Sequence, residues 1–434
     1  MPSPYQFIKP LQQLSNLCKA PLFPAEAIRL SNGLTLIHQY LPATPVVAVD
    51  VWVKAGANAE PQDWQGMAHF LEHMIFKGSE EVRPGEFDWI IETSGGGTNA
   101  ATSHDYAHFF ITTAAAYLPQ TLPYFADILL HAAIPDQEFG REMDVVIEEI
   151  HGCHDDPDWL GFQALCETIY GQSPYGRSIL GTADQVRQRS PHQMRCFHRT
   201  HYQPENMTVV MVGGMEREPA IALVSEAFCH FAVRSECPPV IADPKPQLTE
   251  ITRSELRLPR LEQARLMLAW TGPGVDLMDV GIGLDMLSVI LAGGRSSRLV
   301  RDLREEQQQV WDIGCEFSLQ KSASLITINA WLEAEALPRV EAALQNHLTR
   351  LQTEPITAAE LSRVQRLLCN DYAFSTETPA QLAGLYGYYN TIAQAELAIT
   401  YPTRVQQMTP EILQHIAQDY LKPDCYAVTV MRSL

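Results

Sequence analysis

The 434-residue sequence predicts an α+β protein built from two similarly folded domains. Strand and helix patterns alternate before residue 237 and again after residue 250, and the segment between them, CPPVIADPKPQLTE, contains four prolines. The ends of the two halves also match. SPHQMRCFHRTHYQPENMTVVMV from Ser190 and TPEILQHIAQDYLKPDCYAVTVM from Thr409 correspond at a constant offset of 219 residues. Because each runs from a Ser/Thr-Pro helix start through a Pro-acid pair to a strand, the match indicates a duplication.

The first domain is predicted over residues 26–236, after an irregular, proline-rich arm at residues 1–25. One strand is expected within RLSNGLTLIHQY, residues 29–40, and a second within PVVAVDVWVKAG, residues 45–56. In the second, valine occupies every other position from 47 to 53, which is the period of a strand that is buried on one face.

Further elements follow in this domain. A helix over residues 64–77 is expected to end at Gly78, since glycine is a common helix C-cap residue, and another helix covers 86–94. Three glycines at 95–97 break that helix, and the next stretch, TNAATSHDYAHFFITTA, is β-like. The remaining expected elements are helices at 115–155 and 158–170 and a strand at 207–214.

The second domain is predicted over residues 251–434, beyond a proline-rich linker at 237–250. RLMLAWTG and SLITINAW have the composition of strands, and a long helical pattern near 277–292 lies between them. Helices then continue toward the strand at the C-terminus.

The charge balance bears on the class of partner. The chain has 51 acidic and 31 basic residues and a formal net charge of −20. A nucleic-acid partner is therefore not expected, because a phosphate backbone is bound by a basic surface. The acidic balance is compatible with basic peptide partners, and it equally serves simple solubility.

The cysteines and the hydropathy indicate a cytoplasmic protein. The nine cysteines are odd in number and dispersed, with no CxxC pair, as expected of reduced thiols rather than a disulfide framework. The N-terminal residues lack the apolar core of a secretory signal. No run approaches the roughly 18 apolar residues of a membrane span.

The most informative short stretch is GMAHFLEHMIFKGS, residues 66–79. On a helix, His69 and His73 lie one turn apart on one face, with Glu72 beside them. Burying two imidazoles and a carboxylate is costly unless they have partners. The pattern H-x-x-E-H is also a zinc peptidase signature, with two nitrogen ligands and a carboxylate that can take a proton from bound water. The stretch is therefore either a satisfied polar cluster or a metal site.

A third metal ligand is expected on the predicted helix PDQEFGREMDVVIEEIHG, which begins near Pro135. Its apolar residues form one face, and Glu142 and Glu149 lie two turns apart along the edge of that face. Glu148 points to the opposite side, so Glu149 is the member of the pair that can reach inward. The alternative is that these acids form a solvated rim.

Several motifs in order resemble one family. HFLEH at 69–73, GGTNAATSHD at 96–105, and VVIEEI with PYGRSILGT at 145–150 and 174–182 are similar to the pitrilysin/insulinase family of inverted-zincin metallopeptidases. The closest similarity is to the two-domain branch that includes the mitochondrial processing peptidase β-subunit and bacterial relatives. It covers the chain from about residue 26 to the end. The resemblance implies two duplicated α+β domains, each a mainly antiparallel sheet packed with helices, the second without the metal motif.

The resemblance also implies the roles of single residues. His69, His73 and Glu149 would bind one Zn²⁺ per chain, and Glu72 would activate the zinc-bound water as general base. Glu142 matches an acid that supports the site. In addition, the positions of Asn99 and Ala100 match an edge strand that pairs with the backbone of an extended substrate.

The second half carries GGRSSRLVRDLREEQQQVWDIG, which is similar to a family segment where an arginine and a tyrosine bind the substrate carbonyl. Arg304 matches the arginine, whereas Trp311 stands at the place of the tyrosine. Indole donates an N–H but has no phenolic hydroxyl. The mismatch suggests a heterodimer in which a related subunit supplies the Arg–Tyr pair. A homodimer is the alternative.

These observations together predict a zinc metalloendopeptidase that cleaves extended peptides or unfolded segments. Two other functions stay open. One is a non-catalytic scaffold, although a scaffold would have no chemical need for a complete H-x-x-E-H motif. The other is a subunit that sequesters peptides without cleaving them.

Overall fold

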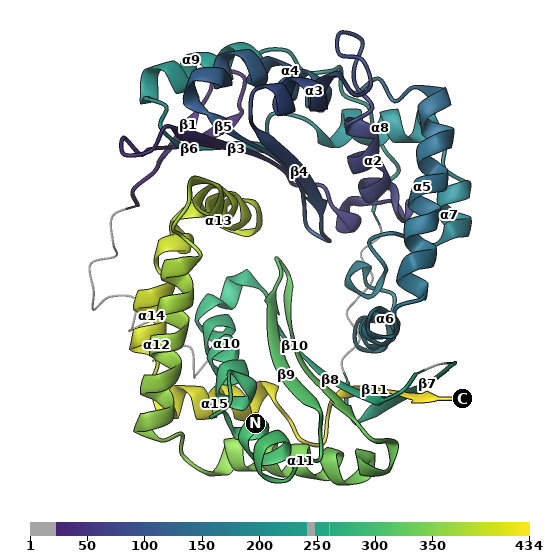
Figure 1. Ribbon diagram of the computed structural model, residues 1–434, viewed down its shortest axis with the longest axis vertical. Coiled ribbons are helices and arrows are strands. Elements are labelled where there is room, and N and C mark those ends of the chain that lie inside the picture. The colour runs from purple at the N-terminus through teal and green to yellow at the C-terminus, as the bar shows by residue number, and fades with distance from the viewer. Residues whose placement is uncertain (1–22, 241–247, 260) are drawn as a thin grey trace. The chain divides into compact units, whose positions relative to one another are not determined.

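The computed structural model describes residues 23–240, 248–259 and 261–434 (Figure 1). Most of the arm expected at residues 1–25, and the middle of the linker expected at 237–250, lie outside the described residues. No helix in the described parts is both long and apolar enough to cross a membrane.

The chain divides into two compact units. The first unit comprises Pro24–Pro246 together with Ser375–Glu396, and the second unit is formed by Gln247–Phe374 and Leu397–Leu434. A division of the chain at the linker alone would assign Ser375–Glu396 to the second unit, whereas this segment packs with the first.

The first unit contains a six-stranded mixed sheet in the order β1-β2-β6-β3-β5-β4. β2 and β6 are parallel, and the other neighbouring pairs are antiparallel. β4 stands at the end of this order, where it pairs with β5 alone. The strands are β1 (Glu26–Arg29), β2 (Thr35–Tyr40), β3 (Val46–Val53), β4 (Gly97–Thr102), β5 (Ala107–Ala114) and β6 (Met207–Gly213).

Helices cover one face of this sheet, where the odd-numbered valines of β3 and the apolar residues of β5 and β6 form the core (Figure 1). The helical pattern expected over 115–155 is two helices, α4 and α5. The helices up to the linker are α2 (Met67–Ile75), α3 (Glu86–Thr93), α4 (Leu118–Leu130), α5 (Asp136–His154), α6 (Pro157–Tyr170), α7 (Ala183–Arg187), α8 (Pro191–His201) and α9 (Arg217–Ala227).

The other face of the sheet is covered by α13 (Pro379–Ile392), a helix from the second half of the chain. Tyr386 donates to Gln39 Oε1 at 2.8 Å, and Asn390 donates to Thr208 Oγ1 at 2.9 Å. As a result, β3 is buried on both faces. The expectation of a strand buried on one face only was wrong, because the residues that cover its second face lie more than 300 positions away.

The second unit contains a five-stranded mixed sheet in the order β7-β11-β8-β10-β9, with β7 and β11 parallel and the other pairs antiparallel. Its strands are β7 (Thr252–Leu258), β8 (Ala264–Pro273), β9 (Asp312–Leu319), β10 (Ala323–Leu332) and β11 (Ala427–Ser433). Its helices are α10 (Met278–Ala292), α11 (Leu337–Thr353), α12 (Ala358–Phe374), α14 (Tyr401–Gln407) and α15 (Pro410–Tyr420).

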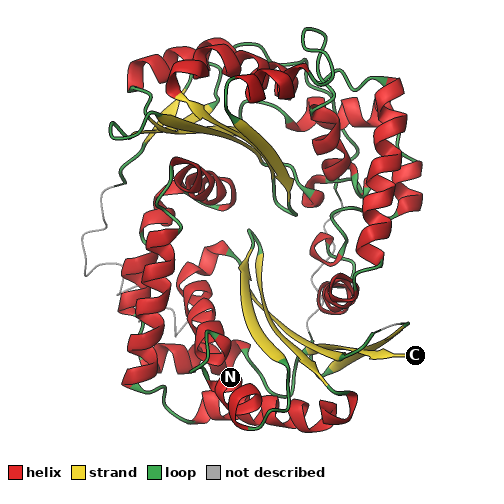
Figure 2. Ribbon diagram, viewed as in Figure 1, coloured by secondary structure: helices red, strands yellow, loops and turns green. Residues whose placement is uncertain are grey.

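The two units repeat one topology. Omitting β1, the order β2-β6-β3-β5-β4 corresponds strand by strand, and in direction, to β7-β11-β8-β10-β9. In both, a helix capped by a Ser or Thr side chain, at Ser190 or Thr409, precedes the strand that makes the parallel pair. Figure 2 shows a sheet packed with helices in each unit. The prediction of two duplicated α+β domains is confirmed.

Candidate metal centre

Helix α2 carries the H-x-x-E-H residues, and two features fix where it begins. Gly66 at its N-cap has φ +82°, and a Cβ there would lie 2.4 Å from the carbonyl oxygen of Leu180. The N-cap offers no side chain of its own. The fully buried Glu60 carboxylate instead accepts hydrogen bonds from the backbone N–H groups of Gly66, at 3.1 Å, and Ala68, at 2.7 Å. A side chain from outside the helix therefore satisfies two N–H groups at its start.

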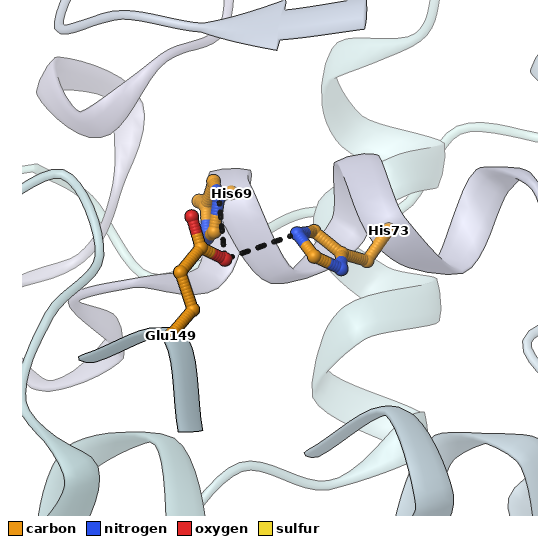
Figure 3. Close-up of side chains that lie close together, drawn as sticks. All are labelled: His69, His73 and Glu149. Carbon is orange, nitrogen blue, oxygen red and sulfur yellow. Dashed lines mark ion pairs between the residues drawn. The ribbon is translucent and has the colours of Figure 1, made fainter. Parts of the chain in front are cut away.

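Three potential ligands converge between α2 and α5. The Nε2 atoms of His69 and His73 lie 3.6 and 3.5 Å from the same carboxylate oxygen, Glu149 Oε2. Figure 3 shows both imidazoles on α2 directed at the carboxylate that rises from α5. One ligand atom from each residue lies within 4.8 Å of the others, and no second such group of three is found within the described residues.

Glu142, two turns before Glu149 on α5, is a buried carboxylate behind His73. Its Oε1 accepts from His73 Nδ1 at 2.9 Å, and its Oε2 pairs with Lys77 Nζ at 2.6 Å. Because Nδ1 donates this bond, Nε2 is the nitrogen whose lone pair, directed toward Glu149, would be available to a metal once it loses its proton. An imidazole held by a carboxylate in this way is the usual support of a histidine ligand to zinc.

The protonation of the two imidazoles differs. Burial lowers the pKa of His69 to about 4, although the charge of Glu149 opposes this. For His73, burial also acts downward, but hydrogen bonds to Glu142 and Glu149 outweigh it and raise the pKa to about 9. His69 therefore offers a neutral nitrogen at neutral pH, and its buried Nδ1 has no hydrogen-bond partner.

The donor set fits zinc. Two imidazole nitrogens and one carboxylate, with an open fourth position, are a ligand set of catalytic zinc sites. Here the atoms converge without a rearrangement of either helix. The carboxylate of Glu149 is 42% exposed, so that the group is accessible from one side.

Glu72 lies beside the ligands on α2, and its Oε2 accepts a hydrogen bond from Thr102 Oγ1 at 2.6 Å. Burial raises the pKa of Glu72, and this bond acts in the opposite direction. The sequence indicated Glu72 but not Thr102. The only signal for Thr102 was its place within the motif GGTNAATSHD.

The structure places the other candidate residues in different surroundings. Asn99 is exposed and Ala100 is half-buried on the edge strand β4. Arg304 and Trp311 belong to the second unit. The Arg304 guanidinium pairs there with Glu305 and Asp312, and Trp311 is 61% exposed, with its indole N–H donating to Glu333 at 3.2 Å.

Fold and site define a class: a duplicated α+β protein with a His–His–Glu group in its first unit. The family model described as insulinase (peptidase family M16) matches residues 35–183, and the model described as peptidase M16 inactive domain matches residues 190–368. The chain therefore belongs to the insulinase, or M16, family of peptidases.

Similar proteins extend over nearly the whole chain. Zinc protease PqqE of Helicobacter pylori is 28% identical over 415 residues, which are 93% of this chain and 92% of that protein. The crystal structure of a protease from Helicobacter pylori has a TM-score of 0.86 at 25% identity and covers 94% of this chain and 99% of its own. A structure from Pseudomonas fluorescens, described as a peptidase M16 inactive domain, shares the fold with a TM-score of 0.85 at 19% identity and covers 95% and 99% of the two chains.

Proposed function

We propose that this protein is a zinc-dependent endopeptidase that cleaves extended peptides or unfolded segments. The observation that carries the proposal is the convergence of His69, His73 and Glu149, with Glu72 next to them on the same helix. Gathering two imidazoles and three carboxylates at one partly open site costs desolvation free energy, and such clusters are typical of catalytic or binding sites. The relative named a zinc protease supports it.

In this proposal each residue has a distinct task. His69, His73 and Glu149 would hold a zinc ion, which would supply Lewis-acid chemistry by acidifying a water molecule and polarising a carbonyl oxygen. Glu142 accepts from His73 Nδ1 and so orients that ring with Nε2 toward the site. Glu72 accepts a proton from the attacking water and delivers it to the leaving amine.

Substrate binding is assigned to the edge of the first sheet. β4 pairs with β5 on one side, and its other side offers backbone groups to an additional strand. A peptide that adds to the sheet at Asn99 and Ala100 is held through main-chain hydrogen bonds, which require an extended conformation but few particular side chains. This supports a substrate class of extended, sequence-diverse peptides.

We also propose that the chain works as a dimer, either with a second copy or with a related subunit that supplies an Arg–Tyr pair. The support is Trp311, which stands where the resembled family has a tyrosine. We propose the cytoplasm as the compartment, which the dispersed cysteines support; cell fractionation would test it.

The test is peptide cleavage by the purified wild type beside Glu72→Gln, with zinc measured in both. We expect stoichiometric zinc in both proteins and a loss of turnover of about 100-fold or more in the variant, the scale of a missing general base. Zinc in both without turnover in either would point to a missing partner subunit.

A second candidate function is a non-catalytic or peptide-sequestering subunit. The match of residues 190–368 to a model described as an inactive domain, and the exposed Trp311, favour it. The same experiment separates the candidates. A scaffold would hold no stoichiometric zinc, and a sequestering subunit would bind zinc and peptide without forming products.

A further inference from the structure

We propose that Thr102 is a positioning residue for Glu72: its hydroxyl holds one carboxylate oxygen so that the other faces the reacting water. This inference deepens the proposed peptidase function and rests on it. The hydrogen bond from Thr102 Oγ1 to Glu72 Oε2 is 2.6 Å long, which is short for a hydroxyl donor and typical of a charge-assisted bond to a carboxylate.

The hydroxyl fixes a side chain that would otherwise be free to rotate. A glutamate has three rotatable side-chain bonds, so that a carboxylate without a fixed partner can occupy several positions. A donor at Oε2 leaves Oε1 as the oxygen that is available for a proton. The base is thereby held in one orientation before substrate arrives, which removes an ordering step from the reaction.

The position of Thr102 is fixed by hydrogen bonds of the backbone around it. It is the last residue of β4, in register with Ala107 of β5, and the turn between the strands closes with a bond from Ser103 N to Tyr106 O at 2.7 Å. Backbone N–H groups of residues 57 and 58 donate to the carbonyl oxygens of Ser103 and His104, at 3.1 and 2.8 Å.

A side chain from a later segment adds to this anchoring. The Asp105 carboxylate in the turn accepts from Asn58 Nδ2 at 2.8 Å and from the Tyr175 hydroxyl at 2.9 Å. The turn is thus held from the loop before α2 and from the loop after α6. The backbone at Thr102 is therefore held in place, and the hydrogen bond restricts the position of the Glu72 carboxylate rather than that of Thr102.

The position also joins two parts of the proposed site. β4 is the strand that we assign to peptide binding, and its side chains alternate between the two faces of the sheet. Thr102 pairs with Ala107 and therefore faces the core side, toward α2, while its backbone belongs to the edge. A peptide that adds to β4 would rigidify the strand whose last residue holds the base.

The same strand offers a matched control. Thr98 lies four residues earlier on the same face of β4, opposite Ile111 of β5. Its Oγ1 is buried and has no hydrogen-bond partner. Thr98→Val and Thr102→Val therefore make the same chemical change on the same face of one strand, and only the second removes a bond to Glu72.

The experiment compares wild type, Thr102→Val, Thr102→Ser and Thr98→Val in zinc content, peptide kinetics and crystal structure. We expect full zinc occupancy in all four proteins. In Thr102→Val, kcat should fall about 10- to 100-fold, the value of one hydrogen bond to a charged group, with KM changed less than about twofold. Thr102→Ser should restore most of kcat, and Thr98→Val should leave the Glu72 carboxylate in its wild-type position.

Several results would overturn the inference. A rise in KM at constant kcat would assign Thr102 to strand pairing alone, and equal losses in Thr102→Val and Thr98→Val would indicate a general effect of packing. The crystal structures give a readout that does not depend on turnover. If the Glu72 carboxylate keeps its wild-type position in Thr102→Val, the positioning role is wrong. The carboxylate could instead be displaced in Thr102→Val and keep its position in Thr102→Ser, while the wild type binds zinc but cleaves no peptide. That result would uphold the positioning role and contradict the peptidase function.

Discussion

At the scale of single residues, the candidate metal centre is formed by side chains from two helices, α2 and α5. The two imidazoles come from one helix face, and their shared neighbour Glu149 comes from another helix. Glu142 fixes the ring of His73 from behind and is itself held by Lys77, which with His73 keeps its pKa low against the effect of burial. Glu142 and Glu149 lie on the same edge of α5 but have different surroundings. Glu142 contacts His73 Nδ1 and Lys77, whereas Glu149 faces the Nε2 atoms of both imidazoles.

The adjacent pair Glu148 and Glu149 allows a direct test of the ligand assignment. We expect Glu149→Gln to lose zinc on dialysis and to lose activity by more than the 10- to 100-fold loss that is typical of residues behind the ligands. The matched variant Glu148→Gln should keep both, because Glu148 is exposed and lies beside His151 at the surface. The measurement is zinc per chain after dialysis, with peptide turnover.

Equal retention of zinc in the two variants would show that the ion, if bound, is held elsewhere. Equal loss would indicate that the charge of the helix, rather than one coordinating oxygen, decides binding.

At the scale of elements, α2 depends on a cap that the helix does not itself contain. Glu60 lies six residues before Gly66, outside the helix, and both of its carboxylate oxygens accept N–H groups of the first turn. Hydrogen bonds to two N–H groups stabilise the first turn of the helix and fix the residue at which the helix begins. Since His69 follows Ala68 directly, this cap also sets where the ligands stand relative to α5.

Glu60 gives a prediction about pH. Burial raises its pKa from 4.5 to about 8, although the amide groups of Ala68 and Gly66 oppose this. Between these two values the folded state binds more protons than the unfolded state, so that this group makes the free energy of unfolding fall as pH rises from about 5 to 8. We expect Glu60→Gln to lack this part of the pH dependence, because its amide does not titrate, and to differ from the wild type by less than about 1 kcal/mol at low pH, where the carboxyl is neutral and also has one carbonyl oxygen as its main acceptor.

Urea denaturation at several pH values would measure this difference. Glu226→Gln, an exposed change on α9, is the control and should leave the wild-type profile intact. A profile of Glu60→Gln that runs parallel to the wild type would contradict the assignment.

At the scale of the whole molecule, the boundary between the two units does not follow the chain. α13 belongs in sequence to the second half and in space to the first unit, where it covers the face of the sheet that contains Asp50 and Trp52. Close packing there depends on a glycine. A Cβ on Gly387 would lie 2.0 Å from Trp52 Nε1, so the backbone of the helix rests on the indole ring.

Two glycines on α13 test this packing. Gly387→Ala should destabilise the protein by about 1–3 kcal/mol, because the added methyl group overpacks against Trp52. Gly384→Ala on the same helix should instead stabilise it by about 0.5–1 kcal/mol, since its Cβ would meet only Asp50 Oδ2 at an ordinary 3.9 Å and alanine is the better helix former. Chemical denaturation of the full chain measures both.

The same sign for both variants would mean that α13 does not pack on the sheet in solution. Opposite signs would show that the first unit is completed by a segment from beyond the linker.

Much of this protein could be predicted from local patterns. Helical periodicity distinguished Glu149 from Glu148, and both the H-x-x-E-H spacing and the alternation of valines in β3 are visible within a few residues. The repeat of 219 residues indicated the duplication, which the matching strand orders of the two sheets confirm. The helix and strand patterns are encoded locally, because backbone geometry repeats every 3.6 residues in a helix and every two in a strand, whereas the repeat is visible only when the two halves are compared.

Only the tertiary structure decided the contacts that link distant segments. No local pattern indicates that α13 covers the second face of β3 or that Thr102 meets Glu72. Each of these depends on how surfaces pack after the elements have formed, and packing selects partners by shape and by the need to satisfy buried polar groups, not by distance along the chain.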